Sequence, residues 1–274
     1  MTVLESARNP RVRAAAELRD RRHRDRTGLT LVDGVREVGR ALDAGIELVE
    51  VFVGPERLAR DAGGRALADR LGRMSIPVHP SGDAVLERIG FGERAEGVVA
   101  VARIPPLDLD RLELPADPLV VVLERVEKPG NLGAVLRSAD GAGASAVLLA
   151  DPLTDLFNPN AIRASLGTIF ALPIASAPAR AVLDYLLDAG IVPWAARVDA
   201  RTIHTDAALV GPIALVLGSE THGLGPTWSD PRVQAVRLPM LGVADSLNVS
   251  IAAAVLLYEA RRQRGTRPTL PRSP

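Results

Sequence analysis

The sequence contains no cysteine and few aromatic residues, with 2 Trp, 2 Tyr and 4 Phe in 274 residues. Without cysteine the chain has no disulfide and no thiolate metal site, which fits a reducing compartment. The four histidines are scattered, so no two are expected on one helical face, and we predict no metal site. The N-terminus carries no signal-peptide pattern, and no apolar run is long enough to span a bilayer. We therefore expect a cytoplasmic protein with no membrane partner.

Net charge is also missing, because 33 basic residues balance 33 acidic ones. The chain as a whole therefore has no electrostatic signature of nucleic-acid binding. The basic residues are nevertheless unevenly distributed, with eight arginines between positions 8 and 26. Two interpretations of this segment stay open. It is a solvated helix with a modest apolar stripe, or an arm whose arginines contact RNA phosphates.

From residue 29 onward, apolar strands alternate with amphipathic helices. This pattern is typical of an α/β sandwich around a mostly parallel sheet. Strands are expected over 29–32, 48–53, 76–78 and 97–103, and helices over 35–44, 58–71 and 82–89. The next stretch, 104–118, contains four prolines and little periodicity, so we interpret it as a linker. The first domain is therefore predicted to span 1–103.

A second α/β domain is predicted over 119–264. It opens with the apolar strand 119–123, of the kind that a parallel sheet buries on both faces. Further strands are expected over 146–150, 192–195 and 213–217, and helices over 134–142, 160–170 and 181–189. We predict a frayed, flexible tail over 265–274, where arginine and proline are abundant.

The stretch 238–259 is the one around which we expect the second domain to be organised. It begins with a Pro-Met-Leu-Gly loop and passes through Asp245, Ser246 and Asn248, residue types that favour caps and turns. Ile251 to Tyr258 follow without a charge. A helix that is apolar all round must be buried on nearly all sides, so we predict a buried helix there.

Several kinds of site are excluded by their missing motifs. No Walker lysine follows a glycine loop, and Gly218-Ser-Glu is not a nucleophile elbow. What remains is three junctions between an apolar strand and a polar loop, after Leu123, Leu217 and Leu238. In open α/β sheets, ligands bind at the carboxyl ends of the strands, so these three loops could converge on one pocket.

The three junctions resemble the three motifs of the SpoU (TrmH) family of RNA ribose 2′-O-methyltransferases. Asn131-Leu-Gly133-Ala-Val-Leu-Arg137 is similar to the first motif, and Leu217-Gly-Ser-Glu220-x-x-Gly223-Leu224 to the second. The third motif resembles the stretch from Leu238-Pro-Met-x-Gly242 through Ser246-Leu-Asn248 to Tyr258-Glu259. The motifs occur in family order over roughly 119–262. More loosely, Asp33-Gly34-Val-Arg36 and Glu96-Gly97-Val-Val-Ala100 resemble the ribosomal-protein-like substrate-binding domain of rRNA-directed members.

This resemblance implies a trefoil-knotted methyltransferase domain that binds S-adenosylmethionine and works as a homodimer on RNA. The cofactor would be held largely by backbone groups at Gly218, Leu238 and Leu247, in a pocket that also includes Leu217, Met240 and Asn248. Such a pocket needs few charges, because adenine and a sulfonium group are recognised by shape, apolar walls and backbone partners.

The resemblance assigns the central catalytic role to Arg137, in some members as the general base. Arginine stays charged at neutral pH, so we expect it to clamp a phosphate and stabilise the developing alkoxide. Asn131 would orient that arginine or the ribose, and Glu220 would fix one of these two side chains. Ser246 and Asn248 would shape the third loop and bond the substrate. Taken alone, these last two residues are better explained as an ordinary turn and cap.

Three functions fit these observations. The first is an rRNA 2′-O-methyltransferase, of housekeeping or antibiotic-resistance type, most simply acting on 23S rRNA. The second is a tRNA ribose 2′-O-methyltransferase, although the extra N-terminal domain favours rRNA. The third is a non-catalytic RNA-binding member of the fold, which the joint presence of Asn131, Arg137, Glu220 and Asn248 disfavours.

Overall fold

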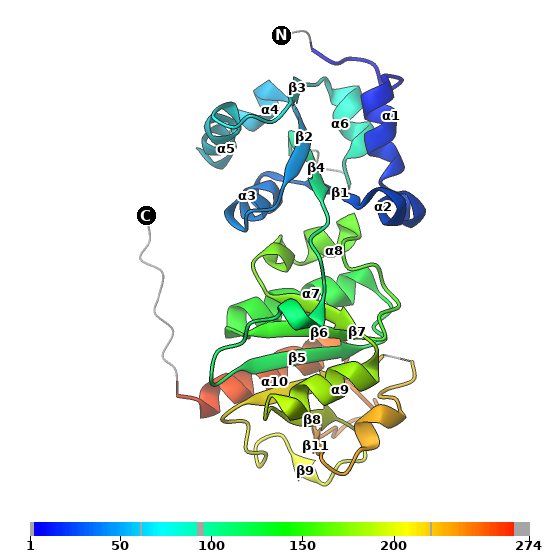
Figure 1. The fold of residues 1–274 in the computed structure, drawn as a ribbon, viewed down its shortest axis with the longest axis vertical. Helices are drawn as coiled ribbons and strands as arrows, with labels where there is room; N and C mark the ends of the chain where they lie inside the picture. Colours follow the sequence, from blue (N-terminus) through cyan, green and yellow to red (C-terminus); the bar gives the residue numbers. More distant parts are fainter. Residues whose placement is uncertain (1–2, 61, 92–95, 220, 266–274) are drawn as a thin grey trace. The chain divides into compact units, whose positions relative to one another are not determined.

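The structure is a computed structural model, and it describes residues 3–60, 62–91, 96–219 and 221–265. The chain is α/β and divides into two compact units (Figure 1). Unit 1 comprises Met1–Pro106, Lys128–Arg137 and Thr154–Ala171. Unit 2 comprises Leu107–Glu127, Ser138–Leu153 and Leu172–Pro274. Two segments that follow residue 118 in sequence therefore group with the N-terminal residues.

The sheet of unit 1 has four strands in the order β1-β4-β2-β3, namely β1 (Leu29–Asp33), β4 (Val98–Arg103), β2 (Leu48–Val53) and β3 (Val78–Pro80). The expectation of a mostly parallel sheet is wrong here. β4 lies between β1 and β2 and is antiparallel to both, and only β2 and β3 pair in parallel. β1 and β2 do run in the same direction, as their helical connection predicts. The alternation of strands and helices in the sequence does not reveal the direction in which β4 runs in the sheet.

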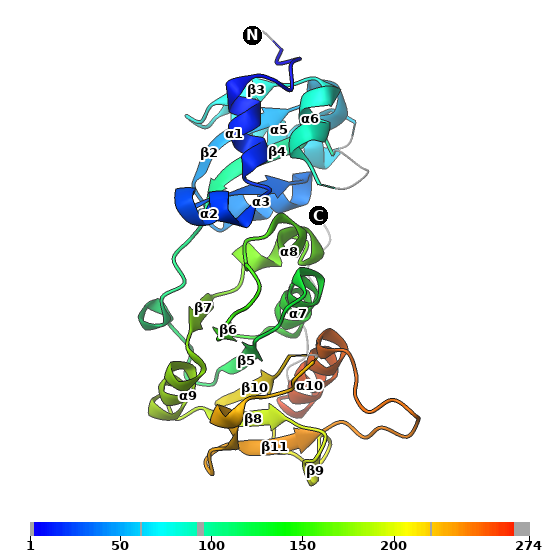
Figure 2. The same cartoon turned by 90° about the vertical axis from the view of Figure 1, so that its right-hand side faces the viewer.

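Helices cover the sheet of unit 1. One core joins α1 (Pro10–Glu17) and α6 (Asp83–Ile89) to side chains of the sheet, among them Leu31, Phe52 and Val99. Further helices are α2 (Arg21–Thr27), α3 (Val35–Asp43), α4 (Pro55–Leu58) and α5 (Ala62–Gly72). The helix predicted over 58–71 corresponds to α5, which begins four residues later, and Leu58 instead ends α4. The strand predicted over 76–78 begins two residues later, as β3. Figure 2 shows α1 and α6 side by side.

The sheet of unit 2 is parallel throughout, as predicted, with the strand order β7-β6-β5-β10-β8-β11-β9. Its strands are β5 (Leu119–Glu124), β6 (Ala146–Ala150), β7 (Ile174–Ala177), β8 (Val192–Ala196), β9 (Thr202–Ile203), β10 (Ile213–Leu217) and β11 (Gln234–Arg237). β5, β6 and β10 are buried along their whole length, which explains why their sequences are apolar apart from Glu124 at the end of β5. β7 and β9 were not predicted.

Two helices flank this sheet on opposite faces, α9 (Ala179–Asp188) and α10 (Val249–Gln263) (Figure 2). α9 packs with Trp228 of the 3₁₀ turn η3 (Pro226–Ser229) on a core that includes Val122, Val182 and Leu186. Within the predicted linker, a second 3₁₀ turn, η1 (Leu109–Arg111), lies close to β7. The Leu107 carbonyl there accepts a hydrogen bond from Ser176 N–H at 2.8 Å.

α10 is not buried on all sides in the single chain, so that prediction is wrong. Ala253, Leu256, Leu257 and Ala260 are buried against unit 2. Ile251, Val255 and Tyr258 are 52%, 37% and 55% exposed. Because these three positions are spaced by four and three residues, they form one stripe along the helix. The sequence identified an apolar helix but could not tell whether its own chain covers it.

Two other helices differ from the prediction. α7 (Pro129–Ala142) begins five residues before the predicted start, within the stretch expected to be a loop. Pro129 at its first position explains this, because proline is well suited to the first turn of a helix. The helix predicted over 160–170 ends early, as α8 (Pro159–Ala164), and is followed by the 3₁₀ turn η2 (Thr168–Phe170). Between them Leu166 and Gly167 have positive φ values, 57° and 80°, which no helix accommodates.

Candidate active site

The three predicted junctions lie at the carboxyl ends of β5, β10 and β11, which belong to the sheet of unit 2. β5 and β10 pair in parallel with Leu123 opposite Leu217, so the loops that follow them leave the same edge of the sheet. β11 pairs in parallel with β8, which pairs in parallel with β10, so its following loop leaves that edge too. Carboxyl ends of parallel strands are where α/β sheets bind ligands. Unit 2 therefore brings the loops 218–225 and 238–248 to one edge.

The loop after β10 closes tightly on itself. Ser219 and Gly223 exchange two backbone hydrogen bonds, of 3.1 and 3.0 Å, and the Ser219 hydroxyl accepts a third from His222 N–H at 3.0 Å. Gly223 adopts a φ of 64°, which favours glycine. A Cβ at position 218 would lie only 2.2 Å from the Gly223 carbonyl carbon. Both glycines of this motif are thus required by the backbone.

Glu124 holds the same loop from the neighbouring strand, and sequence reasoning missed it. The side chain is buried at the end of β5, and its Oε2 accepts a hydrogen bond from Gly225 N–H at 2.6 Å. A hydrogen bond to a buried carboxylate is stronger than one between neutral groups. The available signal was an acidic residue that ends an otherwise wholly apolar strand.

The loop after β11 is exposed over most of its length. Leu238 and Met240 are half-buried, whereas Ser246 and Leu247 are exposed. Asn248 is the N-cap of α10, and its Oδ1 accepts hydrogen bonds from Ser250 N–H at 2.9 Å and from the Ser250 hydroxyl at 2.7 Å. The structure therefore gives Asn248 the capping role that the sequence left open, and this role fixes the start of α10.

The first motif lies on α7. Asn131 is half-buried, and Arg137 is exposed at the end of the α7 segment that belongs to unit 1. Among the described residues, the Arg137 side chain has no hydrogen bond or ion pair, so its guanidinium is available to a ligand. The two residues are six positions apart, which places them about 9 Å apart along the helix axis. Glu220, the predicted partner of these side chains, lies outside the described residues.

Gly133 of the first motif is required by packing. A Cβ there would lie 2.5 Å from the Ala164 Cβ, 2.7 Å from the Ala161 carbonyl oxygen and 2.8 Å from Ser165 N. α7 and α8 therefore approach so closely at this point that no side chain fits between them. The glycine of the Asn-x-Gly pattern holds Asn131 and Arg137 in a fixed relation to α8.

Two further observations concern what the described ranges lack. Within 3–60, 62–91, 96–219 and 221–265, no three His, Asp or Glu side chains are grouped so that they could hold a metal ion. No helix formed by the described part of the chain is long and apolar enough to cross a membrane.

Comparison with known proteins decides the family. Residues 118–258 match the SpoU rRNA Methylase family, and residues 9–100 match the MRM3-like substrate binding domain. The chain belongs to the SpoU rRNA methylase family. Its membership implies that the domain is knotted, as the motifs led us to expect. The matched segment contains every residue that we assigned to the cofactor and to catalysis.

Relatives of known type cover nearly the whole chain. A 23S rRNA (uridine(2479)-2′-O)-methyltransferase from Streptomyces viridochromogenes is 33% identical, with 91% of this chain and 88% of the relative covered. The crystal structure of an RNA 2′-O ribose methyltransferase superposes with a TM-score of 0.84 at 38% identity, covering 97% and 100% of the two chains. An AdoMet-bound rRNA methyltransferase from Sinorhizobium meliloti superposes with a TM-score of 0.85 at 29% identity, covering 95% and 97%.

Proposed function

We propose that this SpoU-family chain is an S-adenosylmethionine-dependent methyltransferase that acts on a ribose 2′-hydroxyl of 23S rRNA. The observation that carries the proposal is the likeness to rRNA 2′-O-methyltransferases over nine-tenths of the chain, N-terminal residues included. The matching N-terminal family is itself described as substrate binding. We propose residues 1–103 as the RNA-binding domain, 104–118 as the linker and 119–264 as the methyltransferase domain. The cytoplasm is the compartment that we propose, because the rRNA-methylating relatives are bacterial and bacteria make and assemble rRNA in the cytoplasm.

The edge of the unit 2 sheet suits the cofactor. We propose that Gly218, Leu238 and Leu247 bind it through backbone groups, and that Leu217, Met240 and Asn248 complete the pocket. Leu217 is buried and Leu238 and Met240 are half-buried, so apolar side chains line the base of the loops. When bound, S-adenosylmethionine supplies the methyl group. The two backbone hydrogen bonds between Ser219 and Gly223 support this assignment, because residues that are already hydrogen-bonded lose less conformational entropy on binding.

Arg137 is the side chain to which we assign charge stabilisation. Its exposed guanidinium can form two parallel hydrogen bonds with a phosphate next to the target ribose. It then stabilises the negative charge that develops on the 2′-oxygen as that hydroxyl loses its proton. We assign Asn131, on the same helix, to orienting the ribose or the arginine, and we keep Glu220 as the proposed partner of these side chains. Ser246, exposed on the third loop, is assigned to substrate binding.

An N-terminal arginine surface supports the RNA-binding assignment. Four exposed arginines of the α1–α2 region have no side-chain hydrogen bond or ion pair among the described residues: Arg8, Arg13, Arg22 and Arg26. Each phosphate contact lowers the slope of log affinity against log salt by roughly 0.7 to 0.9. The variant Arg13→Gln/Arg26→Gln is therefore expected to weaken RNA binding and to make the slope shallower by up to about 1.8. An unchanged slope would show that Arg13 and Arg26 do not contact RNA phosphates and are simply solvated.

A second copy of the chain is the partner that we propose for α10. The stripe of Ile251, Val255 and Tyr258 presents apolar side chains to solvent. The Tyr258 hydroxyl lies 3.1 Å from the site of a Cβ on Gly141, so the end of α7 continues this surface. Val255→Asp should convert a dimer into a monomer in sedimentation velocity. Val210→Asp is the control, because Val210 is also exposed but lies outside the stripe. A wild-type monomer at micromolar concentration would refute the dimer.

The activity test uses methyl-labelled S-adenosylmethionine with total rRNA and, separately, total tRNA, followed by nucleoside analysis. Label in a 2′-O-methylnucleoside of 23S rRNA is expected. Arg137→Ala should lower turnover at least 100-fold and leave the cofactor affinity unchanged, whereas the control Arg180→Ala should alter neither. Arg180 is also an exposed helical arginine, paired with Asp184 on α9. Transfer only to tRNA, or full turnover by Arg137→Ala, would contradict the proposal.

A further inference from the structure

Residues 154–171 lie inside the matched methyltransferase segment, yet they form one compact unit with the N-terminal residues. This segment, which we call the platform, contains α8 and η2. Two of its contacts with the first 106 residues involve a buried charged side chain, Arg24 in one and Asp33 in the other. Charged groups are seldom buried without a specific partner.

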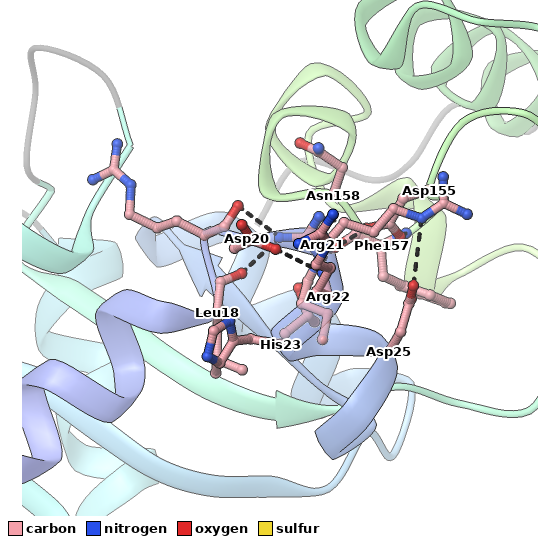
Figure 3. A network of polar contacts seen from close by, with 12 residues as sticks. Leu18, Asp20, Arg21, Arg22, His23, Asp25, Asp155, Phe157 and Asn158 are labelled. Atoms are coloured by element: carbon pink, nitrogen blue, oxygen red, sulfur yellow. Dashed lines mark hydrogen bonds and ion pairs between the residues drawn. The ribbon is translucent and has the colours of Figure 1, made fainter.

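The first contact joins α2 to the start of the platform. Arg24 is 1% exposed, and its Nε and Nη2 atoms lie 2.7 and 2.5 Å from Asp155 Oδ2. Its Nη1 donates to the carbonyl oxygens of Leu18 and Arg19 at 2.6 and 2.9 Å. Figure 3 shows Asp155 and Phe157 of the platform among residues of α2. All three guanidinium nitrogens of Arg24 therefore have partners, and the side chain links α2 to the platform. The neighbouring arginines of α2 are exposed.

The second contact joins β1 to α8. Arg163 Nη1 lies 3.0 Å from Asp33 Oδ2 and also donates to the Phe91 carbonyl oxygen. The Asp33 side chain is 1% exposed, and the same Oδ2 accepts a hydrogen bond from Phe91 N–H at 2.6 Å. Burial raises the pKa of Asp33, although the Phe91 N–H and the Arg163 guanidinium oppose this shift.

Two hydrogen bonds to backbone carbonyl oxygens complete the set. The Thr30 hydroxyl donates to the Phe157 carbonyl oxygen at 2.7 Å, and both groups are buried. Arg40 of α3 donates to the Leu166 carbonyl oxygen at 2.7 Å. The contacts therefore come from α2, β1 and α3 and reach four separate points of the platform. Contacts from three elements fix an orientation, whereas a single contact would allow rotation.

The platform is also fixed to the proposed catalytic helix. α8 meets α7 at Gly133, where no room remains for a Cβ. Asn131 and Arg137 lie two residues before and four residues after this glycine. A continuous packed path therefore runs from β1 and α2, through α8, to the first motif. Packed elements transmit displacement because they deform little.

We propose that the platform is a positioning element, in which Arg163 and Asp155 hold the RNA-binding residues in register with Asn131 and Arg137. This inference rests on the proposed function and adds to it. The N-terminal residues bind the RNA, and the platform sets where the target ribose lies relative to Arg137. Arg163 and Asp155 touch neither RNA nor cofactor. Displacing a reacting group by about 1 Å can lower the rate by about 100-fold.

The kinetic test separates positioning from binding. Arg163→Ala is expected to lower kcat on 23S rRNA at least tenfold, with the dissociation constants for RNA and for S-adenosylmethionine within twofold of wild type. Arg163→Lys should recover most of kcat, because a lysine still pairs with Asp33. Thr30→Val, which removes one hydroxyl and keeps the shape, is a milder variant and should lower kcat about threefold. Arg180→Ala is the matched control and should leave all three constants unchanged.

A distance measurement tests the same inference without catalysis. The chain has no cysteine, so Ala14→Cys and Asn160→Cys introduce two unique attachment points for spin labels, on exposed positions of α1 and α8. We expect a narrow distribution of label distances, which broadens when Arg163→Ala is added. An unbroadened distribution, an unchanged kcat, or equal losses in both dissociation constants would overturn the inference. A wild-type enzyme that methylates no RNA would instead refute the proposed function, and the distance measurement would still decide the inference.

Discussion

Gly133→Ala should destabilise the protein, although the same change usually stabilises a helix. Alanine in place of glycine within a helix contributes about 1 kcal/mol through its higher propensity. At position 133 the added methyl carbon would lie 2.5 to 2.8 Å from the Ala164 Cβ and from backbone atoms of Ala161 and Ser165. None of these atoms belongs to a flexible side chain, so α8 must move away. Overpacking of this kind costs about 1 to 3 kcal/mol, and at such short distances we expect the upper part of that range. The net loss is therefore about 2 kcal/mol.

The assay is urea unfolding followed by circular dichroism, with Gly39→Ala as the control. Gly39 lies in the middle of α3, and a Cβ there meets nothing within 4 Å. The control should raise the free energy of unfolding by up to about 1 kcal/mol, so the two variants should shift the midpoint in opposite directions. If Gly133→Ala is as stable as wild type or more so, α7 and α8 are not packed as closely as described. The reasoning about the platform would then lose its link to Asn131 and Arg137.

Three further predictions concern the cofactor loops and α10. Gly218→Ala should raise the dissociation constant for S-adenosylmethionine at least 100-fold in calorimetry, because its Cβ would lie 2.2 Å from the Gly223 carbonyl carbon and must open the turn. Glu124→Gln should weaken cofactor binding about tenfold and cost about 1 kcal/mol of stability, since a neutral acceptor replaces the carboxylate that holds Gly225. If both values are unchanged, Glu124 does not position the loop. Glu259→Gln should cost about 1 kcal/mol at pH 6 and less at pH 3, because hydrogen bonds from Arg262 and Gln263 lower the pKa of Glu259 from 4.5 to about 2. A carboxylate with a lowered pKa stabilises the fold above its unfolded pKa, and this contribution is lost as the pH falls from about 4.5 to 2. A difference between the two proteins that does not shrink on acidification would contradict this.

The sequence revealed the elements whose cause is local. The strands 146–150 and 213–217 have the predicted bounds, because burial on both faces leaves an unbroken apolar run. The strand 48–53 also has its predicted bounds, although Glu50 interrupts its apolar sequence. The second motif also contains Gly218, but the motif alone does not say why a glycine is needed there. Only the structure shows that Gly223 occupies the space a side chain would need.

Features that depend on a distant partner were beyond the sequence. Arg24 looked like the other arginines of its segment, and nothing nearby indicates that Asp155, 131 residues later, buries it. Glu124 looked like the first residue of a loop, because its partner Gly225 is 101 positions away. The direction of β4 and the exposure of Tyr258 belong to the same group. Each is set by which surfaces meet, and periodicity does not encode that.

The long separation between Arg24 and Asp155 has a consequence for synthesis. The ribosome adds roughly 5 to 20 residues per second, so the 131 residues that separate the two side chains take about 7 to 26 s to make. The interval between the synthesis of Asp33 and that of Arg163 is nearly as long, because 130 residues separate them. During this interval the nascent N-terminal segment holds an arginine and an aspartate whose counter-charges do not yet exist. Its last step of folding is therefore timed by the emergence of the platform, and the earliest part of the chain is completed only when the middle has been translated.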